Sequence, residues 1–112
     1  MDKVIYLQPG KMIFDALLDL MELQKGAEKL NDPLCGALSF VTLMYGIAWE
    51  IRFKITEIDR TRCAVTIEVL PEERNEVTQG YIDTMTRREQ ALLDSMLLIG
   101  TQQEIERLSA AN

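Results

Sequence analysis

Apolar and polar residues alternate strictly in the middle of the chain, between residues 47 and 69. The first run has apolar residues at every second position: Ile47, Trp49, Ile51, Phe53 and Ile55. The second run has the same pattern: Cys63, Val65, Ile67 and Val69. A period of two is typical of a strand with one dry and one wet face. Because only a short polar stretch, 58–62, separates the runs, they are predicted to form an antiparallel hairpin.

Three elements are predicted before this hairpin. Lys3–Gln8 is a short strand that Pro9-Gly10 closes. Residues 11–25 form a helix, and Gly26 is its C-terminal stop. After turn residues at 31–33, the stretch Ala37–Tyr45 is rich in β-branched and aromatic residues. That stretch is predicted to be a buried strand with a turn or bulge at Tyr45-Gly46.

The last third of the chain is predicted to be helical after a loop. Residues 71–80 are charged and polar without a period, which is typical of a loop. The capping-box pattern Thr86-Arg-Arg-Glu89 places a helix start near residue 87, or one turn earlier at 83 or 84. Gly100 ends this helix, and Thr101-Gln-Gln-Glu104 starts a short final one. One stripe at helical spacing is apolar: Met85, Leu92, Met96 and Ile99.

These elements predict one α+β domain over residues 1–112. Their order is β-α-β-β-β-α, followed by a short C-terminal tail helix. Because the strands cluster in the middle of the chain and the helices flank them, we expect a mostly antiparallel sheet of about four strands. The helices should pack on one face of that sheet.

Composition and charge narrow the function. The 112 residues are 47% hydrophobic and carry a net charge of −6, which suits a folded domain and argues against nucleic-acid binding. Histidine is absent, so a catalytic triad with a histidine base cannot be built. Neither a cofactor nor a catalytic constellation is predicted.

The two cysteines and the hydropathy pattern bear on location. Cys35 and Cys63 lie among apolar residues and are predicted to be buried free thiols, too few and too far apart for a metal site. No signal peptide is expected in the first 11 residues. The longest uncharged stretch, 33–49, falls short of a membrane span. We therefore expect a cytoplasmic protein with neither membrane nor nucleic acid as partner.

Two groups of acidic residues are candidate metal ligands. Asp15, Asp19 and Glu22 fall on one face of the first predicted helix, where they could bind a hard cation or simply form its wet edge. A second acidic group lies in the predicted loop: Glu72, Glu73 and Glu76. Since metal sites usually draw ligands from several elements, both groups are interpreted as solvated surface and no metal site is predicted.

An apolar pocket between the sheet and the C-terminal helix is the alternative to a filled core. Methionine adapts to irregular apolar spaces and a tryptophan over a sheet can line a pocket. The residues that would line it come from the facing strands and helix: Phe40, Met44, Trp49 and Met96.

The first predicted helix is apolar around most of its circumference. Ile13, Leu17 and Leu20 should pack on the sheet, opposite the polar row of Lys11, Asp15, Asp19 and Glu22. Two apolar flanks remain, more than a surface helix needs. The C-terminal helix can cover one flank, and a second chain is the simplest cover for the other. The flank predicted for self-association comprises Phe14, Leu18 and Met21, because an aromatic anchor suits an interface.

The stretch Tyr45–Val69, with its phrase Ile-Thr-Glu-Ile-Asp-Arg-Thr-Arg before the second hairpin strand, resembles the central hairpin of the START/Bet v 1-like (helix-grip) superfamily. Small bacterial proteins of unknown function with a β-α-β-β-β-α order have a similar layout. The resemblance implies a role in apolar-ligand binding or interaction, and it implies no chemistry. It carries no functional residue over to this chain.

The sequence therefore favours a non-enzymatic interaction module that forms a homo-oligomer, most simply a homodimer. The alternative is a small carrier or sensor that binds an apolar small molecule between the sheet and the C-terminal helix. A third class, an enzyme that uses carboxylates alone, would lack histidine and a paired-acid geometry.

Overall fold

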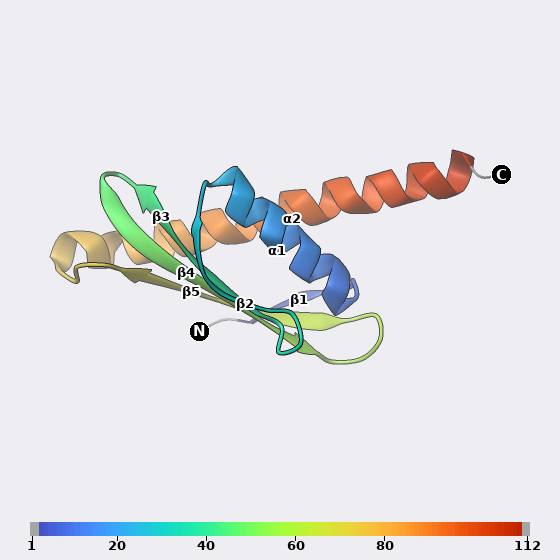
Figure 1. Cartoon of the computed structure of the whole chain (residues 1–112), viewed down its shortest axis with the longest axis horizontal. Helices are drawn as coiled ribbons and strands as arrows, with labels where there is room; N and C mark the ends of the chain where they lie inside the picture. The colour runs from blue at the N-terminus through green and yellow to red at the C-terminus, as the bar shows by residue number, and fades with distance from the viewer. Residues whose placement is uncertain (1–2, 111–112) are drawn as a thin grey trace.

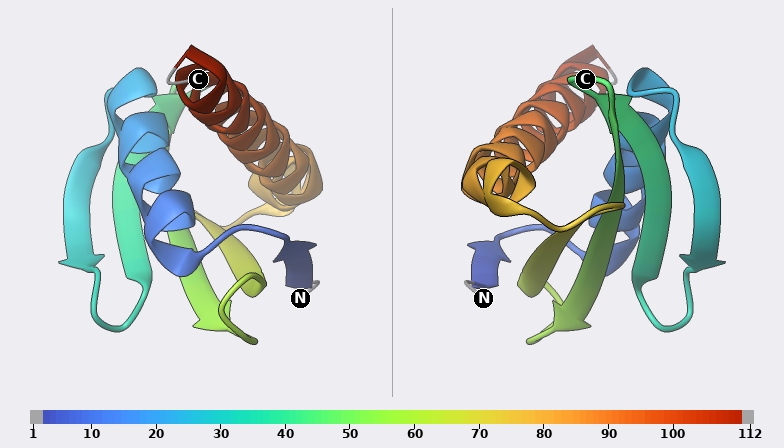
Figure 2. Two further views of the ribbon diagram at one scale, coloured as in Figure 1. Left: turned by 90° about the vertical axis from the view of Figure 1, so that its right-hand side faces the viewer. Right: turned by 90° about the vertical axis from the view of Figure 1, so that its left-hand side faces the viewer.

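The computed structural model describes residues 3–110, with side chains as far as Ile99. Five strands and two helices follow one another in the order β1 (Lys3–Tyr6), α1 (Gly10–Leu23), β2 (Ala27–Asp32), β3 (Ala37–Met44), β4 (Ile47–Glu57), β5 (Cys63–Pro71) and α2 (Glu76–Ala110). The strands form one antiparallel sheet in the order β1-β5-β4-β3-β2 (Figure 1). Both helices lie side by side on one face of this sheet (Figure 2). The predicted α+β class and the helices on one face are confirmed.

The predicted hairpin is confirmed in its pairing and its faces. In the β4–β5 register Ile51 pairs with Val69, Phe53 with Ile67, and Ile55 with Val65. Trp49, Ile51, Phe53 and Ile55 are all buried on the face that the helices cover. Phe53 also stacks on Phe40 of the neighbouring strand, with 6.1 Å between ring centroids. This continuous apolar surface is the floor of the core.

Strand β2 was not predicted, which makes the sheet five-stranded. It lies at the sheet edge, and five of its six residues are exposed. Its pairing with β3 is interrupted by a bulge between Glu28 and Leu30. A solvated edge strand with an extra residue shows no alternation of apolar and polar positions, so its sequence gave no strand signal.

Helix α2 differs from the prediction at both ends. It begins at Glu76, because Asn75 caps it: Asn75 Oδ1 accepts hydrogen bonds from the N–H groups of Val77 (2.9 Å) and Thr78 (3.0 Å). Thr86, the predicted cap, lies inside the helix. At the other end α2 runs through Gly100 to Ala110 without a break. The predicted loop at 71–80 is therefore only residues 72–75, and the separate tail helix does not exist.

The buried stripe of α2 also differs from the predicted one. Met85 is buried as expected, but Leu92 and Met96 are only partly buried and Ile99 is 53% exposed. The fully covered positions repeat every four residues from Met85: Glu89, Leu93 and Leu97. This stripe contains a charged residue, so its apolar pattern was hidden in the sequence.

Gly26 ends α1 in a different way from the one predicted. Lys25, with φ 54°, takes the left-handed conformation, and the N–H groups of Lys25 and Gly26 bond to the carbonyls of Glu22 and Met21. This is a Schellman motif with lysine in the usual glycine position. Gly26 is required for another reason: a Cβ there would lie 2.4 Å from Cδ2 of Phe40. The glycine lets the α1–β2 connection lie directly on the core.

The first prediction concerns the packing of Phe53. Phe53→Ala should lower the free energy of unfolding by about 3–5 kcal/mol, because it empties a buried site between two strands and the helices. The neighbouring Arg52→Ala, on the solvent face, should cost about 1 kcal/mol or less. Urea unfolding measures both. A loss below about 1 kcal/mol for Phe53→Ala would mean that the faces of the sheet are assigned wrongly.

The second prediction compares two glycines. Gly26→Ala should destabilise the protein by roughly 1–3 kcal/mol, because the new methyl group meets the Phe40 ring. Gly80→Ala is the matched control: Gly80 lies within α2 and a Cβ there has nothing within 4 Å. It should stabilise the protein by about 0.5–1 kcal/mol through helix propensity. Thermal or urea unfolding of the pair reads out both signs, and equal effects would contradict the close approach.

Candidate functional site

Helix α2 is longer than the sheet it covers. At about 1.5 Å per residue, its 35 residues span nearly the whole 55 Å long axis of the molecule. Figure 1 shows its C-terminal part extending past the sheet and past α1. Leu97 is the last buried residue among those whose side chains are described. We call residues 98–110, the part of α2 after Leu97, the tail.

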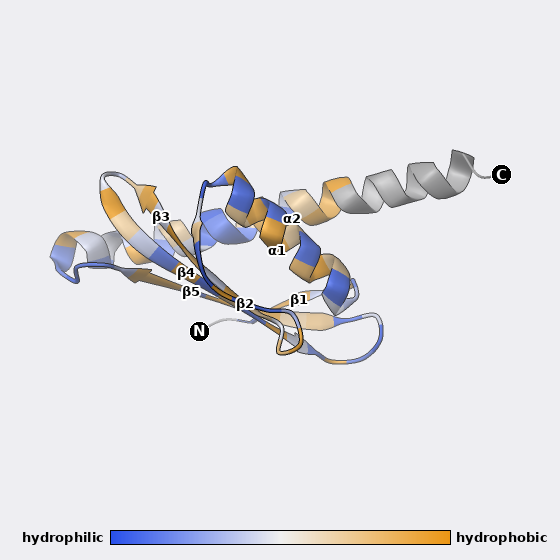
Figure 3. Cartoon of the chain, in the orientation of Figure 1, coloured by the Kyte–Doolittle hydropathy of each residue, from blue (hydrophilic) through white to orange (hydrophobic). Residues whose placement is uncertain are grey.

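The tail begins with two large exposed apolar residues. Leu98 is 59% exposed and Ile99 is 53% exposed, and Figure 3 shows the hydrophobic segment of α2 at the point where it leaves the body. Leu98 follows the buried Glu89 by nine positions, which at about 100° per residue is half a turn around the helix. Leu98 therefore faces away from its own core.

The start of the tail was visible in the sequence as the apolar pair Leu98 and Ile99. The interpretation of Gly100 as a helix stop made this pair the end of a helix, whereas α2 continues through Gly100 to Ala110.

The base of the tail is fixed to the sheet by a tyrosine. The hydroxyl of Tyr6 on β1 donates a 2.6 Å hydrogen bond to Asp94 Oδ1 on α2, one turn before Leu98. Burial of the hydroxyl, together with Asp94, raises the pKa of Tyr6 well above its usual range, so Tyr6 stays protonated and keeps donating. This bond ties α2 to β1 one turn before the tail begins.

A polar cluster around the buried Glu89 joins the C-terminal end of α1 to α2. Glu89 on α2 has no accessible surface. Its carboxylate accepts hydrogen bonds from the Gln24 amide (2.7 Å) and the Arg88 guanidinium (3.3 Å), and Arg88 also donates to Gln24 Oε1 (2.7 Å). The Thr42 hydroxyl of β3 donates to the backbone carbonyl of Gln24 (3.0 Å). Gln24 thus links α1, α2 and β3 at one point.

Glu89 has a structural role in this arrangement and is not placed to act on a substrate. Burial raises the pKa of its carboxyl, and the Gln24 hydrogen bond and the Arg88 charge offset only part of that effect. A carboxyl with a raised pKa is typical of general acids. Because Glu89 has no accessible surface, however, a substrate cannot reach it in this structure.

The third prediction tests the raised pKa of Glu89. A carboxyl whose pKa is higher in the folded state adds stability that is fully present below its unfolded pKa, near 4.5, and lost as pH rises through the folded value. Glu89→Gln keeps a side chain that can bond to Gln24 but cannot ionise. Its stability relative to wild type should therefore increase from pH 4 to pH 7 in urea unfolding. A difference that is constant with pH would contradict the raised pKa.

The residues predicted to line an apolar pocket lie in the core or against it. Phe40 and Trp49 are completely buried, Met44 and Met96 are partly buried against the core, and the Trp49 indole N–H donates to the carbonyl of Met44 (3.1 Å). Met96 also lines a surface hollow between α1 and α2. These residues form a packed core, and the carrier hypothesis gains no support from the hollows.

The flank of α1 predicted for self-association is covered by the chain itself. Phe14 is buried, and Leu18 and Met21 are partly buried against the core. Phe14 lines a surface hollow together with Pro33 and Gly36 of the β2–β3 turn, and Met21 lies beside Gly26. Ile13, Leu17 and Leu20 are fully buried, as predicted.

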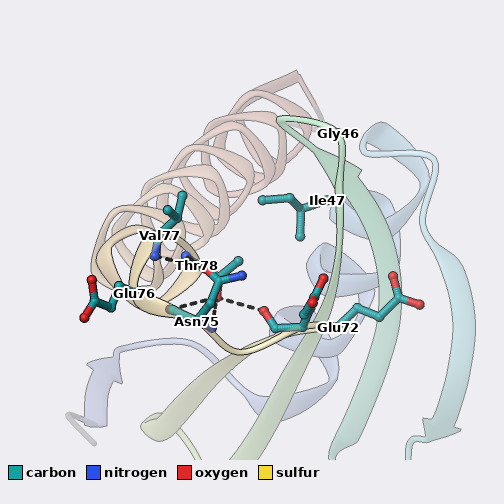
Figure 4. A pocket seen from close by; sticks show the side chains of 8 residues that line it. Gly46, Ile47, Glu72, Asn75, Glu76, Val77 and Thr78 are labelled. Atoms are coloured by element: carbon teal, nitrogen blue, oxygen red, sulfur yellow. Dashed lines mark hydrogen bonds between the residues drawn. The ribbon is translucent and has the colours of Figure 1, made fainter.

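The acidic loop residues lie at the N-terminus of α2. Glu72, Glu73 and Glu76 border a hollow between the β3–β4 turn and the first turn of α2 (Figure 4). Negative charge is favourable beside the exposed N–H groups of a helix start, which accounts for their position. Among the described residues, no group of three or more cysteine, aspartate or glutamate side chains is placed to hold a metal ion.

The solvent face of the sheet carries a ladder of ion pairs. Glu50 bonds to both Lys29 (2.6 Å) and Arg52, and Arg52 also reaches Glu68 (3.1 Å). The hydrogen bond from Lys29 lowers the pKa of the Glu50 carboxyl, and the hydrogen bond and charge of Arg52 lower it further. These partly exposed pairs satisfy one another across β2, β4 and β5. The same face also carries the exposed apolar side chains of Leu30 and Leu43.

The two cysteines differ in their exposure. Cys63 is buried as predicted, but Cys35 is exposed, because it lies in the turn between β2 and β3.

Neither helix, over its described residues, has an apolar run long enough to cross a bilayer. No protein-family profile and no curated protein matches this chain. The resemblance to helix-grip proteins stays a prediction.

Proposed function

We propose that this chain is a non-enzymatic interaction module that forms a homodimer through the tail of α2. The observation that carries the proposal is the exposure of Leu98 and Ile99 at the start of the tail. They lie on a helix that has already left its own core. On a soluble domain such a surface is typical of a site that another protein covers.

Helix stability supports the same proposal. An isolated helix of fewer than about 12–15 residues is marginal in water, because most helical stability in proteins comes from packing. The tail continues α2 to Ala110 beyond the last residue found buried. A partner helix along the side of α2 that carries Leu98 would pack against the tail. A second copy is the simplest partner, since twofold dimers are the commonest assemblies.

The proposal includes a cytoplasmic location and no catalytic role. The exposed free thiol of Cys35 suits a reducing compartment. The lack of histidine and the inaccessible position of Glu89 both argue against general acid–base catalysis near neutral pH.

The fourth prediction tests the homodimer. Leu98→Glu should weaken association by about 2 kcal/mol or more, roughly 30-fold in the dissociation constant, because it places a charge in the apolar contact. Leu43→Glu is the control, since Leu43 is 74% exposed on β3. Sedimentation velocity over micromolar concentrations measures both.

The expected result is a dimer for wild type and for Leu43→Glu, and a folded monomer for Leu98→Glu. Circular dichroism confirms that each variant is folded. A wild-type chain that stays monomeric throughout the concentration range would end the proposal.

A further inference from the structure

Two exposed tyrosines stack on each other where the turn between β3 and β4 meets the first turns of α2. The ring centroids of Tyr45 and Tyr81 are 5.4 Å apart, with 23° between the ring planes. Tyr45 is 63% exposed and Tyr81 is 40% exposed. Tyrosine is enriched among the residues that dominate protein interfaces, because a large ring gives much contact area for little loss of conformational entropy. This ordered pair of exposed rings is therefore a candidate contact surface for a partner.

The backbone at Tyr45 is strained. Tyr45 (φ 55°) and Gly46 (φ 72°) both take the left-handed conformation, which a two-residue hairpin turn of this kind requires at both central positions. Glycine and asparagine suit such positions, whereas a bulky aromatic residue is unusual there. Asparagine at position 45 would therefore serve the turn better than tyrosine does. Strained residues gather at functional sites, and here the strained residue carries the ring that stacks on Tyr81.

A cleft with an apolar part lies beside the tyrosine pair. It is the hollow that the acidic loop residues border, and its volume is about 620 Å³ (Figure 4). Ile47 and Val77 contribute apolar side chains to its lining. Gly46 of the lining directly follows Tyr45, and Val77 lies one helical turn before Tyr81. The tyrosine pair and the hollow therefore adjoin, and we call them together the turn–helix cleft.

The turn–helix cleft is negatively charged. None of the ion pairs between described side chains includes Glu72, Glu73 or Glu76. Arg74 lines a different hollow, beside β5. The start of α2 contributes about half of a positive charge, which is less than the charge of one carboxylate. Glu72 and Glu76 lie on opposite sides of the cleft (Figure 4), so the negative charge is spread along it and is not gathered around one ion.

We propose that the turn–helix cleft binds an extended, arginine-rich segment of a partner protein. The guanidinium group of arginine stacks on aromatic faces and also pairs with carboxylates, whereas the compact ammonium group of lysine lacks the planar stacking contact. The methylene stem of such an arginine fits the apolar lining at Ile47 and Val77. Charge complementarity therefore selects a basic partner, and it argues against a nucleic acid, whose phosphates would be repelled.

This inference goes beyond the proposed homodimer, because the turn–helix cleft lies at the end of α2 opposite the tail (Figure 1). A second copy of this chain is a poorer occupant than a separate basic partner. Two of its arginines already pair with neighbouring acids, Arg62 with Asp59 and Arg88 with Glu89. The two surfaces can therefore be tested separately.

Peptide binding to the full chain tests the proposal. The probe is a fluorescently labelled eight-residue peptide of alternating arginine and glycine, compared with a peptide of alternating lysine and glycine. Tyr45→Asn removes the ring and keeps a residue that suits the turn. A second variant removes the charge of the cleft: Glu72→Gln/Glu73→Gln/Glu76→Gln. Its matched control removes three exposed charges of α1: Asp15→Asn/Asp19→Asn/Glu22→Gln. Fluorescence anisotropy gives each dissociation constant, and urea unfolding checks each fold.

Both cleft variants should weaken binding of the arginine peptide. Tyr45→Asn should do so roughly 5-fold or more, because the guanidinium loses its stacking contact, and it should unfold at about the same urea concentration as wild type. The glutamine variant should weaken binding on the order of 10-fold, and the α1 control should stay close to wild type. The lysine peptide should bind wild type more weakly and should lose little with Tyr45→Asn. Leu98→Glu should leave binding unchanged.

Several results would overturn the proposal. One is an arginine peptide that does not bind wild type even at millimolar concentration. Another is a loss of binding in the α1 control equal to that in the glutamine variant, since net charge alone would then explain it. A Tyr45→Asn variant that binds as wild type does would remove the stacking contact. If the cleft variants dissociate the homodimer in sedimentation and leave peptide binding unchanged, a second copy occupies the cleft and the basic partner is wrong.

Discussion

The apolar face of β4 and β5 has to be covered, and the rest of the molecule follows from how two helices cover it. Trp49, Ile51 and Phe53 face the helices and have almost no accessible surface. Helix α1 covers part of this face, with Ile13, Leu17 and Leu20 buried. Helix α2 crosses beside it and then continues past the sheet. The tail is the part of α2 that this core does not need, which is why we assign it to a partner.

Polar contacts fix where the helices lie on that face. Apolar packing tolerates small shifts of one helix along another, but hydrogen bonds do not. Gln24 joins Glu89 and Arg88 at one end of the α1–α2 contact, and Tyr6 holds Asp94 near the other. Removing one partner from such a buried cluster leaves an unsatisfied group that costs about 1–3 kcal/mol. These bonds therefore hold α2 to α1 and to β1 along the body of the molecule.

The sequence predicted elements that alternate or repeat strongly and missed those that do not. The alternation from Ile47 to Val69 was enough to give the hairpin and its faces. Strand β2 is a bulged, solvated edge without a period, so it was missed. Gly100 was read as a helix end from local propensity alone, although one glycine in a helix interior costs only about 1 kcal/mol. That interpretation hid the continuation of α2 past Leu98, and with it the candidate site.

The central claim is that the full chain pairs through its tail, and a native mass spectrum of freshly purified wild-type protein tests it most directly. It reports the number of chains and any retained small molecule together. The account predicts a species of twice the 12.8 kDa chain mass without added mass at micromolar concentration. A single-chain species at every concentration would contradict it, and a single chain with a bound apolar molecule would favour the carrier hypothesis instead.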